Sequence, residues 1–562
     1  MKNTNLNRFF AAENISYDLD SYRTQCNRNF LIVGGSGTGK TRSQVTINLL
    51  ACNGSYVVSD PKGNLYSKYH KAMESEGYKT YLVDFINPAR GEGYNFFQDL
   101  CTEDDFLRVA DTIVRIHSNK GSTDSAFWDA TETFTIAGIL ALIKDLQNIM
   151  ESVPDEIPDV CEISDRRFSY VDIVAKRFLR QGDLRYQRTI GGMTRLLDDM
   201  STEFFIDPVV RQDCIEHYMQ QYLNTLSSAA IGNHGMRDLL SLIHSAKEQN
   251  YPNLTTLIHG LNDIFTATAQ AGAYSSDAQS RNAANAFLRY AINGAVNLLR
   301  DIERHDMFTH FALLKALRPN SFGARQIDRV MNLSAEKTAS NIIISTHAAL
   351  ARYDSSAINS MMERAEKHAF DFTRTGREKT AVFVCVSDTD RKMDGFANIF
   401  YTLFLQKLCT YADTACGQNC SLPVPVTFIF DDFGTNVKIS EFPRQISSFR
   451  SRNIGVMLLI QAESQLEQYY GYDAKTIIAN CDTYIYLGGS DLMNARSISE
   501  RTDRPVQDIL YMPVGSNIIF RRGEQPQFGR NIDHDRFLKW IGFEETYPAS
   551  HPVKTSERAP AV

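Results

Sequence analysis

The sequence predicts an α/β fold in which a parallel-rich sheet is interrupted by a long helical insertion. Three observations predict it. Short β-branched runs alternate with helical segments over the first hundred residues, this pattern returns after residue 378, and helical periodicity dominates the residues between. Strands separated by helices form a parallel sheet covered on both faces, because each connecting helix packs back onto the sheet.

The first part of the sheet is predicted from three apolar runs. Asn29–Val33 ends in a glycine-rich loop, which is followed by the helix Thr41–Ala51. The runs Ser55–Ser59 and Thr80–Phe85 each stop at a turn that contains proline. Such turns end strands. We therefore assign residues 1–102 to the first part of an α/β nucleotide-binding domain.

Residues 103–378 are predicted to form an inserted all-α domain. In this region runs of β-branched residues bounded by turns become scarce. Apolar residues instead recur at helical spacing and form one broad face. The segments that show this pattern are Phe134–Ile149, Leu239–Ala246, Ala283–Arg300 and Ile342–Tyr353.

The α/β pattern resumes in residues 379–546, the second part of the nucleotide-binding domain. It contains the helix Phe396–Ala412. The remaining segment, residues 547–562, carries Pro, Ser and Lys and is expected to be a frayed tail. The predicted strands are Thr380–Val386, Val426–Phe430, Val456–Ile460, Thr483–Leu487 and Asn517–Phe520.

A glycine-rich loop after the first strand carries the strongest chemical signal. It fits the pattern G-x-x-x-x-G-K-[ST] in full. It also lies between a strand and a helix, so the N-terminus of that helix would face a bound phosphate group. Glycines let backbone N–H groups approach phosphate oxygens without a Cβ in the way. We expect ATP to bind here, with Lys40 on the outer phosphates and Thr41 on Mg²⁺. The loop consists of Gly34, Gly35, Ser36, Gly37, Thr38, Gly39, Lys40 and Thr41.

An acidic pair follows the strand Val426–Phe430. A P-loop needs a carboxylate at the end of a neighbouring strand, and we expect Asp431 to organise Mg²⁺ and Asp432 to polarise the attacking water. Paired acids after a strand can also simply cap a turn or helix.

Three further residues are candidates for the catalytic site. Gln461 closes the strand Val456–Ile460 and is expected to sense the γ-phosphate; a buried glutamine bonded only to backbone is the alternative. Arg450 and Arg452 precede that strand. In ring ATPases an arginine from the next subunit stabilises transition-state charge, although arginines on a surface helix are commonly only solvated. We can assign no chemical role to Asp60 or Lys62.

Composition sets limits on the class of protein. The 562 residues are 43% hydrophobic and carry a net charge of −7, so two or more domains are expected and a uniformly basic surface is excluded. The ten cysteines form no C-x-x-C pair, which favours reduced thiols over disulfides or a metal site. The apolar run Thr133–Ile143 is too short to span a bilayer. Just before it, Phe127 and Trp128 are expected to pack in the helical core.

Several motifs resemble the conjugative coupling proteins of type IV secretion systems, often called TraG-like. They occur in family order between Asn29 and Arg530. Together they are far more specific than the P-loop alone. The matching stretches are NFLIVGGSGTGKT, VVSDPKGNL, GYNFF, AFWDA, SDTDR, FIFDDF, RSRNIG, LLIQAESQL and IIANCDTYIYLGG.

The resemblance implies a RecA-like P-loop ATPase domain with an inserted all-α domain. It also implies hexameric rings that use ATP to deliver single-stranded DNA with its relaxase to the membrane components of a secretion channel. By motif, Lys40 corresponds to the family's phosphate-binding residue and Thr41 to its Mg²⁺-binding residue. Asp431 and Asp432 correspond to the acidic pair, and Gln461 to the residue that senses the γ-phosphate. Family members usually begin with transmembrane helices, which are not found here. We therefore expect either a cytoplasmic chain recruited to the membrane by a partner or a shortened piece of a longer protein.

Two other departures from the family pattern have consequences. The second acid of the pair is Asp432 where the family has glutamate. This side chain is shorter by about 1.5 Å, so hydrolysis is expected to be slow. Asn95 is followed by Phe96 instead of proline. The alternatives to a motor on single-stranded DNA are a nucleotide-gated docking adaptor with little DNA pumping and a hexameric translocase on double-stranded DNA.

Overall fold

The computed structural model describes residues 7–543 except 116–122, 161–167, 181–186, 205, 232–236, 276, 306–307, 334–335, 368–369, 388, 434–437 and 440. The predicted tail, residues 547–562, lies outside the described residues. Contacts divide the chain into two compact units, Met1–Glu92 with Phe370–Val562 (unit 1) and Gly93–Ala369 (unit 2). The sequence places the corresponding boundaries at 102/103 and 378/379.

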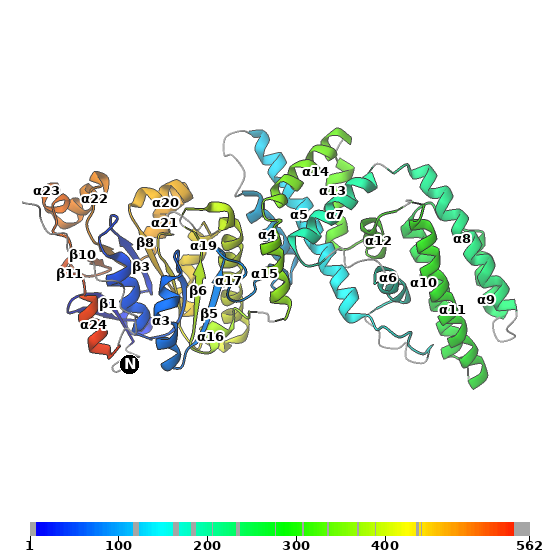
Figure 1. The fold of residues 1–562 in the computed structure, drawn as a ribbon, viewed down its shortest axis with the longest axis horizontal. Helices are drawn as coiled ribbons and strands as arrows, with labels where there is room; N and C mark the ends of the chain where they lie inside the picture. Colours follow the sequence, from blue (N-terminus) through cyan, green and yellow to red (C-terminus); the bar gives the residue numbers. More distant parts are fainter. Residues whose placement is uncertain are drawn as a thin grey trace, which may run out of the picture. The chain divides into compact units, whose positions relative to one another are not determined.

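A nine-stranded sheet forms the centre of unit 1 (Figure 1). Its strand order is β11-β10-β9-β3-β8-β7-β4-β6-β5. The seven strands from β9 to β5 are parallel, while β10 runs antiparallel to both of its neighbours, β9 and β11. The predicted α/β class with a mostly parallel sheet is confirmed. The strands are β3 (Asn29–Val33), β4 (Ser55–Ser59), β5 (Lys79–Asp84), β6 (Thr380–Cys385), β7 (Val426–Phe430), β8 (Ile454–Ile460), β9 (Thr483–Tyr486), β10 (Ser516–Arg521) and β11 (Gln527–Arg530).

Helices connect these strands, and a small hairpin precedes the sheet. Strands β1 (Arg8–Ala12) and β2 (Ile15–Asp18) pair antiparallel. The α-helices of unit 1 are α1 (Ser21–Thr24), α2 (Thr46–Leu50), α3 (Asn64–Ser75), α16 (Arg374–Arg377), α17 (Asp394–Ala415), α19 (Phe442–Gln445), α20 (Glu463–Tyr470), α21 (Ala474–Ala479), α22 (Leu492–Thr502), α23 (Val506–Leu510) and α24 (His534–Ile541). A π-helical turn, η1 (Thr41–Val45), leads into α2, and the short 3-10 turns are η5 (Arg391–Met393), η6 (Gly417–Asn419), η7 (Ile446–Ser448), η8 (Arg450–Arg452) and η9 (Gly471–Asp473).

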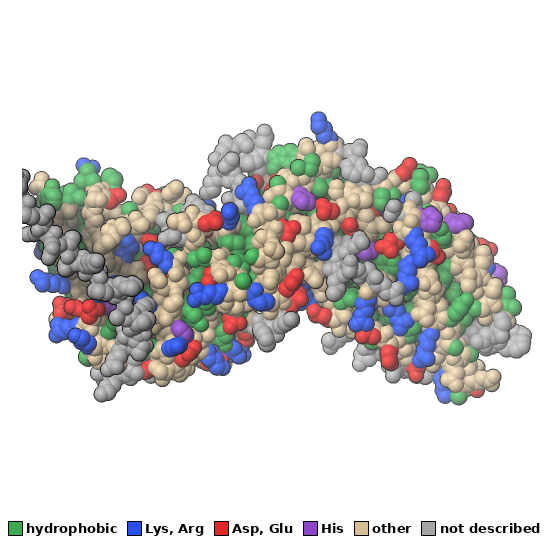
Figure 2. All heavy atoms as spheres, viewed as in Figure 1, with side chains coloured by type: hydrophobic (Ala, Val, Ile, Leu, Met, Phe, Trp, Pro, Cys, Tyr) green, Lys and Arg blue, Asp and Glu red, His purple; other side chains and the backbone are tan. Residues whose placement is uncertain are grey.

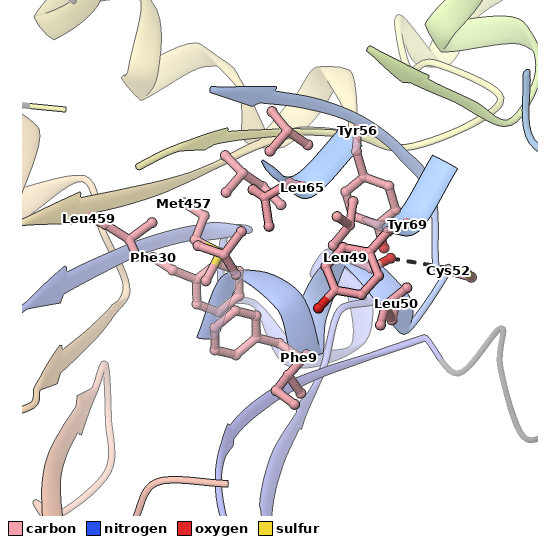
Figure 3. Close-up of a cluster of buried hydrophobic side chains, with 14 of the residues drawn as sticks. Phe9, Phe30, Leu49, Leu50, Cys52, Tyr56, Leu65, Tyr69, Met457 and Leu459 are labelled. Atoms are coloured by element: carbon pink, nitrogen blue, oxygen red, sulfur yellow. Dashed lines mark hydrogen bonds between the residues drawn. The ribbon is translucent and has the colours of Figure 1, made fainter. Parts of the chain in front are cut away.

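The hydrophobic core of unit 1 joins the hairpin to the sheet (Figure 3). The rings of Phe9 and Phe30 stack with their centroids 3.7 Å apart. Leu49 of α2 and Met457 of β8 belong to the same buried cluster. Burying a side chain of this size stabilises the fold by roughly 1.5–3 kcal/mol. The cluster therefore holds β3, β8 and the helix after β3 in fixed positions below the glycine-rich loop.

The described residues of unit 2 form helices and the segments that connect them, without a strand. Its longest helix, α5, packs against α4, α13, α14 and α7. The helices are α4 (Glu103–Arg115), α5 (Thr123–Ser152), α6 (Tyr170–Leu179), α7 (Ile190–Phe204), α8 (Pro208–Ile231), α9 (Arg237–Lys247), α10 (Leu254–Ala273), α11 (Ala278–Glu303), α12 (His310–Leu317), α13 (Phe322–Leu333), α14 (Glu336–Ala351) and α15 (Ser356–Lys367), after the short turn η2 (Phe96–Gln98).

Two details of unit 2 bear on the sequence predictions. Phe127 is 53% exposed, so the prediction that it packs in the helical core is wrong; it lies near the start of α5, before the helix enters the core. Asn95 is buried: its Oδ1 accepts from the N–H of Phe97 and its Nδ2 donates to the carbonyls of Arg188 and Met362. The departure from Asn-Pro therefore falls in a structural turn.

One described helix is long and apolar enough to cross a membrane by length and composition. It is the part of α5 from Ala126 to Ser152, and half of its most apolar window is buried inside the protein. The uninterrupted apolar run is short, as the sequence indicates, but the helix around it is longer. Its buried residues, such as Ile139 and Leu140, are those of a core helix.

Candidate nucleotide site

The glycine-rich loop lies at the carboxyl end of β3, in the middle of the sheet. β3 pairs with β8 on one side and β9 on the other, with Val33 opposite Ile460 and Tyr486. The N–H of Gly34 donates to the carbonyl of Ile460 (3.1 Å), and the N–H of Gly35 donates to that of Gly488 (3.0 Å). Both neighbouring strands thus fix the first turn of the loop.

The glycines of the loop serve different purposes. Gly37 and Gly39 have φ of +79° and +85°, a backbone conformation that residues with a Cβ rarely adopt. A Cβ on Gly34 would lie 2.7 Å from Oγ1 of Thr38, whereas the nearest atom to a Cβ on Gly35 is 3.5 Å away. Conformation therefore requires glycine at two positions, and close packing requires it at a third.

Lys40 and Thr41 are positioned by the first turn of the helix that follows. The Lys40 ammonium is buried and donates to the carbonyls of Gly34 (2.6 Å) and Gly35 (3.2 Å). Burial lowers the pKa of Lys40, while the charges of Asp432 and Asp431 act in the opposite direction. Thr41 begins the π-helical turn η1; such widened turns are frequent at functional sites.

The two halves of the predicted site meet at Thr41 and Asp431. The Thr41 hydroxyl donates to Oδ2 of Asp431 over 2.6 Å, across 390 residues of sequence. Asp431 follows β7, which lies beside β8 in the sheet. Burial raises the pKa of Asp431; the Thr41 hydrogen bond lowers it and the charge of Asp432 raises it.

These two residues fit a magnesium ion. A hydroxyl and a carboxylate are hard oxygen ligands, and Mg²⁺ commonly uses one or two carboxylates together with waters and substrate phosphates. Within the described residues no group of three or more His, Cys, Asp or Glu could hold a metal by itself. A site with Thr41 and Asp431 therefore depends on a phosphate ligand to complete it.

Asp432 and Gln461 also lie at the carboxyl ends of the strands. Asp432 has φ of +57°, and its charge acts on Lys40. Gln461 is exposed directly after β8, one strand from Asp431, and its N–H donates to the side chain of Gln465 at 2.8 Å. Their roles as water-polarising and sensing residues stay predictions.

The two arginines are not brought to this site. They form η8 before β8, at the opposite end of the strand from Gln461. A strand of that length spans roughly 20 Å, so neither arginine reaches the loop of its own chain. Arg450 donates to the carbonyl of Ser21 and to the Gln25 side chain, and Arg452 forms an ion pair with Asp413.

Asp60 has a structural role that the sequence left open. It is 2% exposed, and its carboxylate accepts from the N–H groups of Asn64 (3.0 Å) and Tyr66 (2.9 Å) at the start of α3. Its charge also contributes to raising the pKa of Asp431. Lys62, in contrast, is exposed.

Asn531 is a contact to the loop that sequence reasoning missed. It follows β11, and its Nδ2 donates to the carbonyl of Thr38 over 3.2 Å. No local motif marks this residue, because it reaches the loop only when β10 and β11 complete the sheet. The Gly488-Gly489 pair, which contacts Gly35, carried a stronger signal: it closes one of the matching family stretches.

The fold and this loop define a P-loop protein of the α/β class. Two family models match the chain: "Type IV secretory system Conjugative DNA transfer" over residues 2–157 and "TraM recognition site of TraD and TraG" over residues 425–502. These segments contain both the glycine-rich loop and the acidic pair. Over these two segments the chain is similar to the coupling proteins of type IV secretory conjugative DNA transfer.

Solved structures of one bacterial conjugative coupling protein are similar at low identity. The unbound monoclinic form of TrwBdeltaN70 is 12% identical, with a TM-score of 0.49 over 97% of this chain and 91% of that chain. TrwB in complex with the non-hydrolysable ATP analogue ADPNP is also 12% identical (TM-score 0.47; 91% and 86% covered). So is TrwB with ADP and Mg²⁺ (0.45; 90% and 85%). The comparison with curated proteins finds no match.

Proposed function

We propose that this chain is a coupling protein that hydrolyses ATP and uses the energy to deliver single-stranded DNA with its attached relaxase to a conjugative type IV secretion channel. The observation that carries the ATPase is the 2.6 Å contact between Thr41 and Asp431. It brings a P-loop hydroxyl and a strand-end carboxylate together, as a nucleotide–magnesium site requires. The match to the conjugative DNA-transfer family model supports DNA as the transported substrate.

The residues of the loop account for phosphate binding. Its backbone N–H groups and the N-terminus of the following helix attract negative charge. The Lys40 ammonium moves from its carbonyl acceptors to the outer phosphates. Thr41 and Asp431 would hold Mg²⁺, which would neutralise part of the negative charge on the phosphates. Asp432 holds the attacking water by accepting its hydrogen bond, and Gln461 contacts the terminal phosphate from the neighbouring strand.

Hydrolysis in the presence of DNA tests the proposal. We expect the purified chain to hydrolyse ATP with Mg²⁺ and to do so faster with single-stranded than with double-stranded DNA. The mass in solution, measured in parallel, should rise toward a hexamer under the same conditions. Equal stimulation by both kinds of DNA would favour the double-strand translocase. No hydrolysis above that of a Lys40→Ala variant would exclude an ATPase.

The docking adaptor is the second candidate, and the acidic pair favours it. Asp432 replaces the longer glutamate of the family, and the chain carries a net charge of −7. An adaptor would bind nucleotide and partner but would hydrolyse slowly and contact few DNA phosphates. Affinity for single-stranded DNA should then depend weakly on salt, whereas a motor with several phosphate contacts loses affinity steeply as salt rises.

A protein partner is proposed for the second matched segment. The model for residues 425–502 describes a TraM recognition site in TraD and TraG, and we expect the same segment here to bind a TraM-like protein. Met493 in this segment is 70% exposed. Titrating a TraM-like protein from the same transfer system against the wild type and Met493→Asp should show weaker binding to the variant. Equal binding would place the contact elsewhere.

A further inference from the structure

The central sheet of unit 1 ends at β11, which pairs with β10 alone among the described strands (Figure 1). Along an antiparallel pair, residues whose N–H and C=O face the partner strand alternate with residues whose groups face away. The N–H of Asn531 donates to the carbonyl of Gly515 at 2.7 Å. By this alternation, Arg530 and Phe528 direct their backbone groups away from β10. The carbonyl of Arg530 accepts from Glu13, in the turn of the β1–β2 hairpin, at 2.8 Å.

This arrangement leaves an open hydrogen-bonding edge at Phe528. In the described part of the chain, no other backbone group bonds to the outward N–H or C=O of Phe528. The side chain is 46% exposed, so the edge can be reached from solvent. An exposed strand edge accepts an added strand, because an incoming extended chain supplies the missing donors and acceptors.

A pocket of about 420 Å³ opens beside this edge. Phe528 and Arg530 share one face of β11, because side chains two residues apart point the same way, and both line the pocket. Gly529 faces the other side, where a Cβ would lie 2.8 Å from that of Ala12 in the hairpin. Ile518, opposite Phe528 on β10, also lines the pocket. A side chain of an added strand that points to this face would therefore enter the pocket.

The pocket carries unpaired positive charge. The Arg504 guanidinium lies 3.7 Å from the ring centroid of Phe528, and Arg530 is exposed on the strand. Within the described residues neither guanidinium forms an ion pair. Of the two carboxylates in the lining, Glu13 is ion-paired with an arginine of α24 at 3.1 Å, which leaves only Asp508 to oppose the two arginines. This balance favours a carboxylate ligand, to which guanidinium groups form strong, directed hydrogen bonds.

Exposed apolar side chains adjoin the pocket. Met512 and Pro513 line it, and their neighbours in the chain, Tyr511 and Val514, are 82% and 89% exposed. Apolar side chains gather on the surface of α22 and α23 (Figure 2). Exposed apolar groups rimmed by polar residues mark surfaces that bind protein chains. A nucleic acid would instead bring phosphates toward Asp508 and leave the open strand edge unused.

We infer that the edge of β11 and this pocket form a docking site for an extended acidic segment of a partner protein. The segment adds a strand to β11 through the N–H and C=O of Phe528, and one of its carboxylate side chains enters the pocket between Arg504 and Arg530. These three residues lie beyond the matched segment 425–502, so the site is separate from the TraM-like contact proposed above. It also goes beyond the proposed ATPase, because it uses no residue of the phosphate loop.

Selection from a displayed library of random octapeptides provides the probe. The full chain is the target, and the double variant Arg504→Glu/Arg530→Glu is used for counter-selection. We expect peptides enriched on the wild type to contain an acidic residue flanked by β-branched residues, which favour strands. The tightest of these, made synthetically, should bind the double variant at least about tenfold more weakly, the scale of a lost charged hydrogen bond. Enrichment of no peptide over the double variant would overturn the inference.

Arg496→Glu is the matched control. Arg496 is an exposed arginine of α22 that does not line the pocket. It changes the net charge as Arg530→Glu alone does, and it should bind the selected peptide like the wild type. Equal losses in these two single variants would mean that net charge alone attracts the peptide, which would overturn the site. Both positions are exposed, so the fold should survive, which circular dichroism checks.

Changes to the peptide test each half of the site. In an added strand only every second residue directs its N–H toward β11, so N-methylation of alternate residues should abolish binding, and N-methylation of the residues between them should not. Insensitivity to both would exclude strand addition. Replacing the acidic residue by its amide should weaken binding at least about tenfold; an unchanged Kd would exclude the arginines as its partners. An oligodeoxythymidine that displaced the peptide and failed to bind the double variant would assign the surface to nucleic acid instead.

Discussion

The ammonium group of Lys40 lies 2.6 Å from the carbonyl oxygen of Gly34, the residue at the opposite end of the same glycine-rich loop. Burial lowers the pKa of Lys40, and the two neighbouring aspartates act in the opposite direction. The lysine is therefore held inside the loop, close to where the outer phosphates would lie. Mutation of Lys40 is therefore the most direct test of the predicted nucleotide site.

Lys40→Ala should lower the rate of ATP hydrolysis by at least about a hundredfold, the usual effect of removing one donor to transition-state charge. Phosphate release under saturating ATP measures it. Lys62→Ala provides the control, because Lys62 is an exposed lysine that follows β4, the next strand along the chain. Comparable rates for the wild type and Lys40→Ala would contradict the site.

Asp431→Asn should stabilise the nucleotide-free protein while abolishing magnesium-dependent hydrolysis. Burial raises the pKa of Asp431, so the folded protein takes up this proton at a higher pH than the unfolded chain does. The ionised carboxylate costs stability above the folded pKa, and the cost disappears as pH falls through it. Asparagine removes the cost and keeps an oxygen that can accept from Thr41.

The measurement is thermal unfolding with pH as the variable. At neutral pH the Asp431→Asn variant should melt a few degrees above the wild type, since roughly 1 kcal/mol shifts Tm by about 2–4 °C in a domain of this size. The two curves should converge in acid, where Asp431 is protonated. A variant that melts lower at neutral pH would show that the carboxylate stabilises the fold instead.

Gly34→Ala and Gly35→Ala should differ in their effects on stability and on ATP affinity, although the two residues are adjacent. A Cβ at position 34 would meet Thr38 and Leu487 at 2.7 and 2.9 Å, so something must shift, at a cost of about 1–3 kcal/mol. At position 35 the nearest atom is 3.5 Å away, an ordinary contact. Melting temperature and ATP affinity should fall for the first variant and change little for the second. Equal effects would mean that the loop requires glycine at both positions.

Arg450→Ala tests whether an arginine completes the site of a neighbouring subunit. Because Arg450 lies at the far end of β8 from its own loop, its loss should leave ATP affinity unchanged and lower kcat by a factor of a thousand or more, as for other arginines that act between subunits. Mixing this variant with Lys40→Ala should restore part of the activity. Unchanged kcat would leave Arg450 with only its contacts to Ser21 and Gln25.

Much of the fold could be predicted because each part of it has a local cause. Asn29–Val33, Ser55–Ser59 and Val426–Phe430 are strands with the predicted bounds. Each is a short apolar run ended by a turn, buried on both faces. The strand β11 (Gln527–Arg530) was missed because it is short, half-exposed and without apolar alternation.

The sequence by itself identified the predicted phosphate-binding loop, because its residues are contiguous and their types and spacing make up the whole motif. It also determined that strands and helices alternate around a helical insertion. Only the tertiary structure decided which distant residues meet that loop. Strand order places Asp431 beside Thr41, Asn531 beside Thr38 and the two arginines at the opposite end of β8. Order in a parallel sheet depends on how crossover helices pack, which no local pattern of residues encodes.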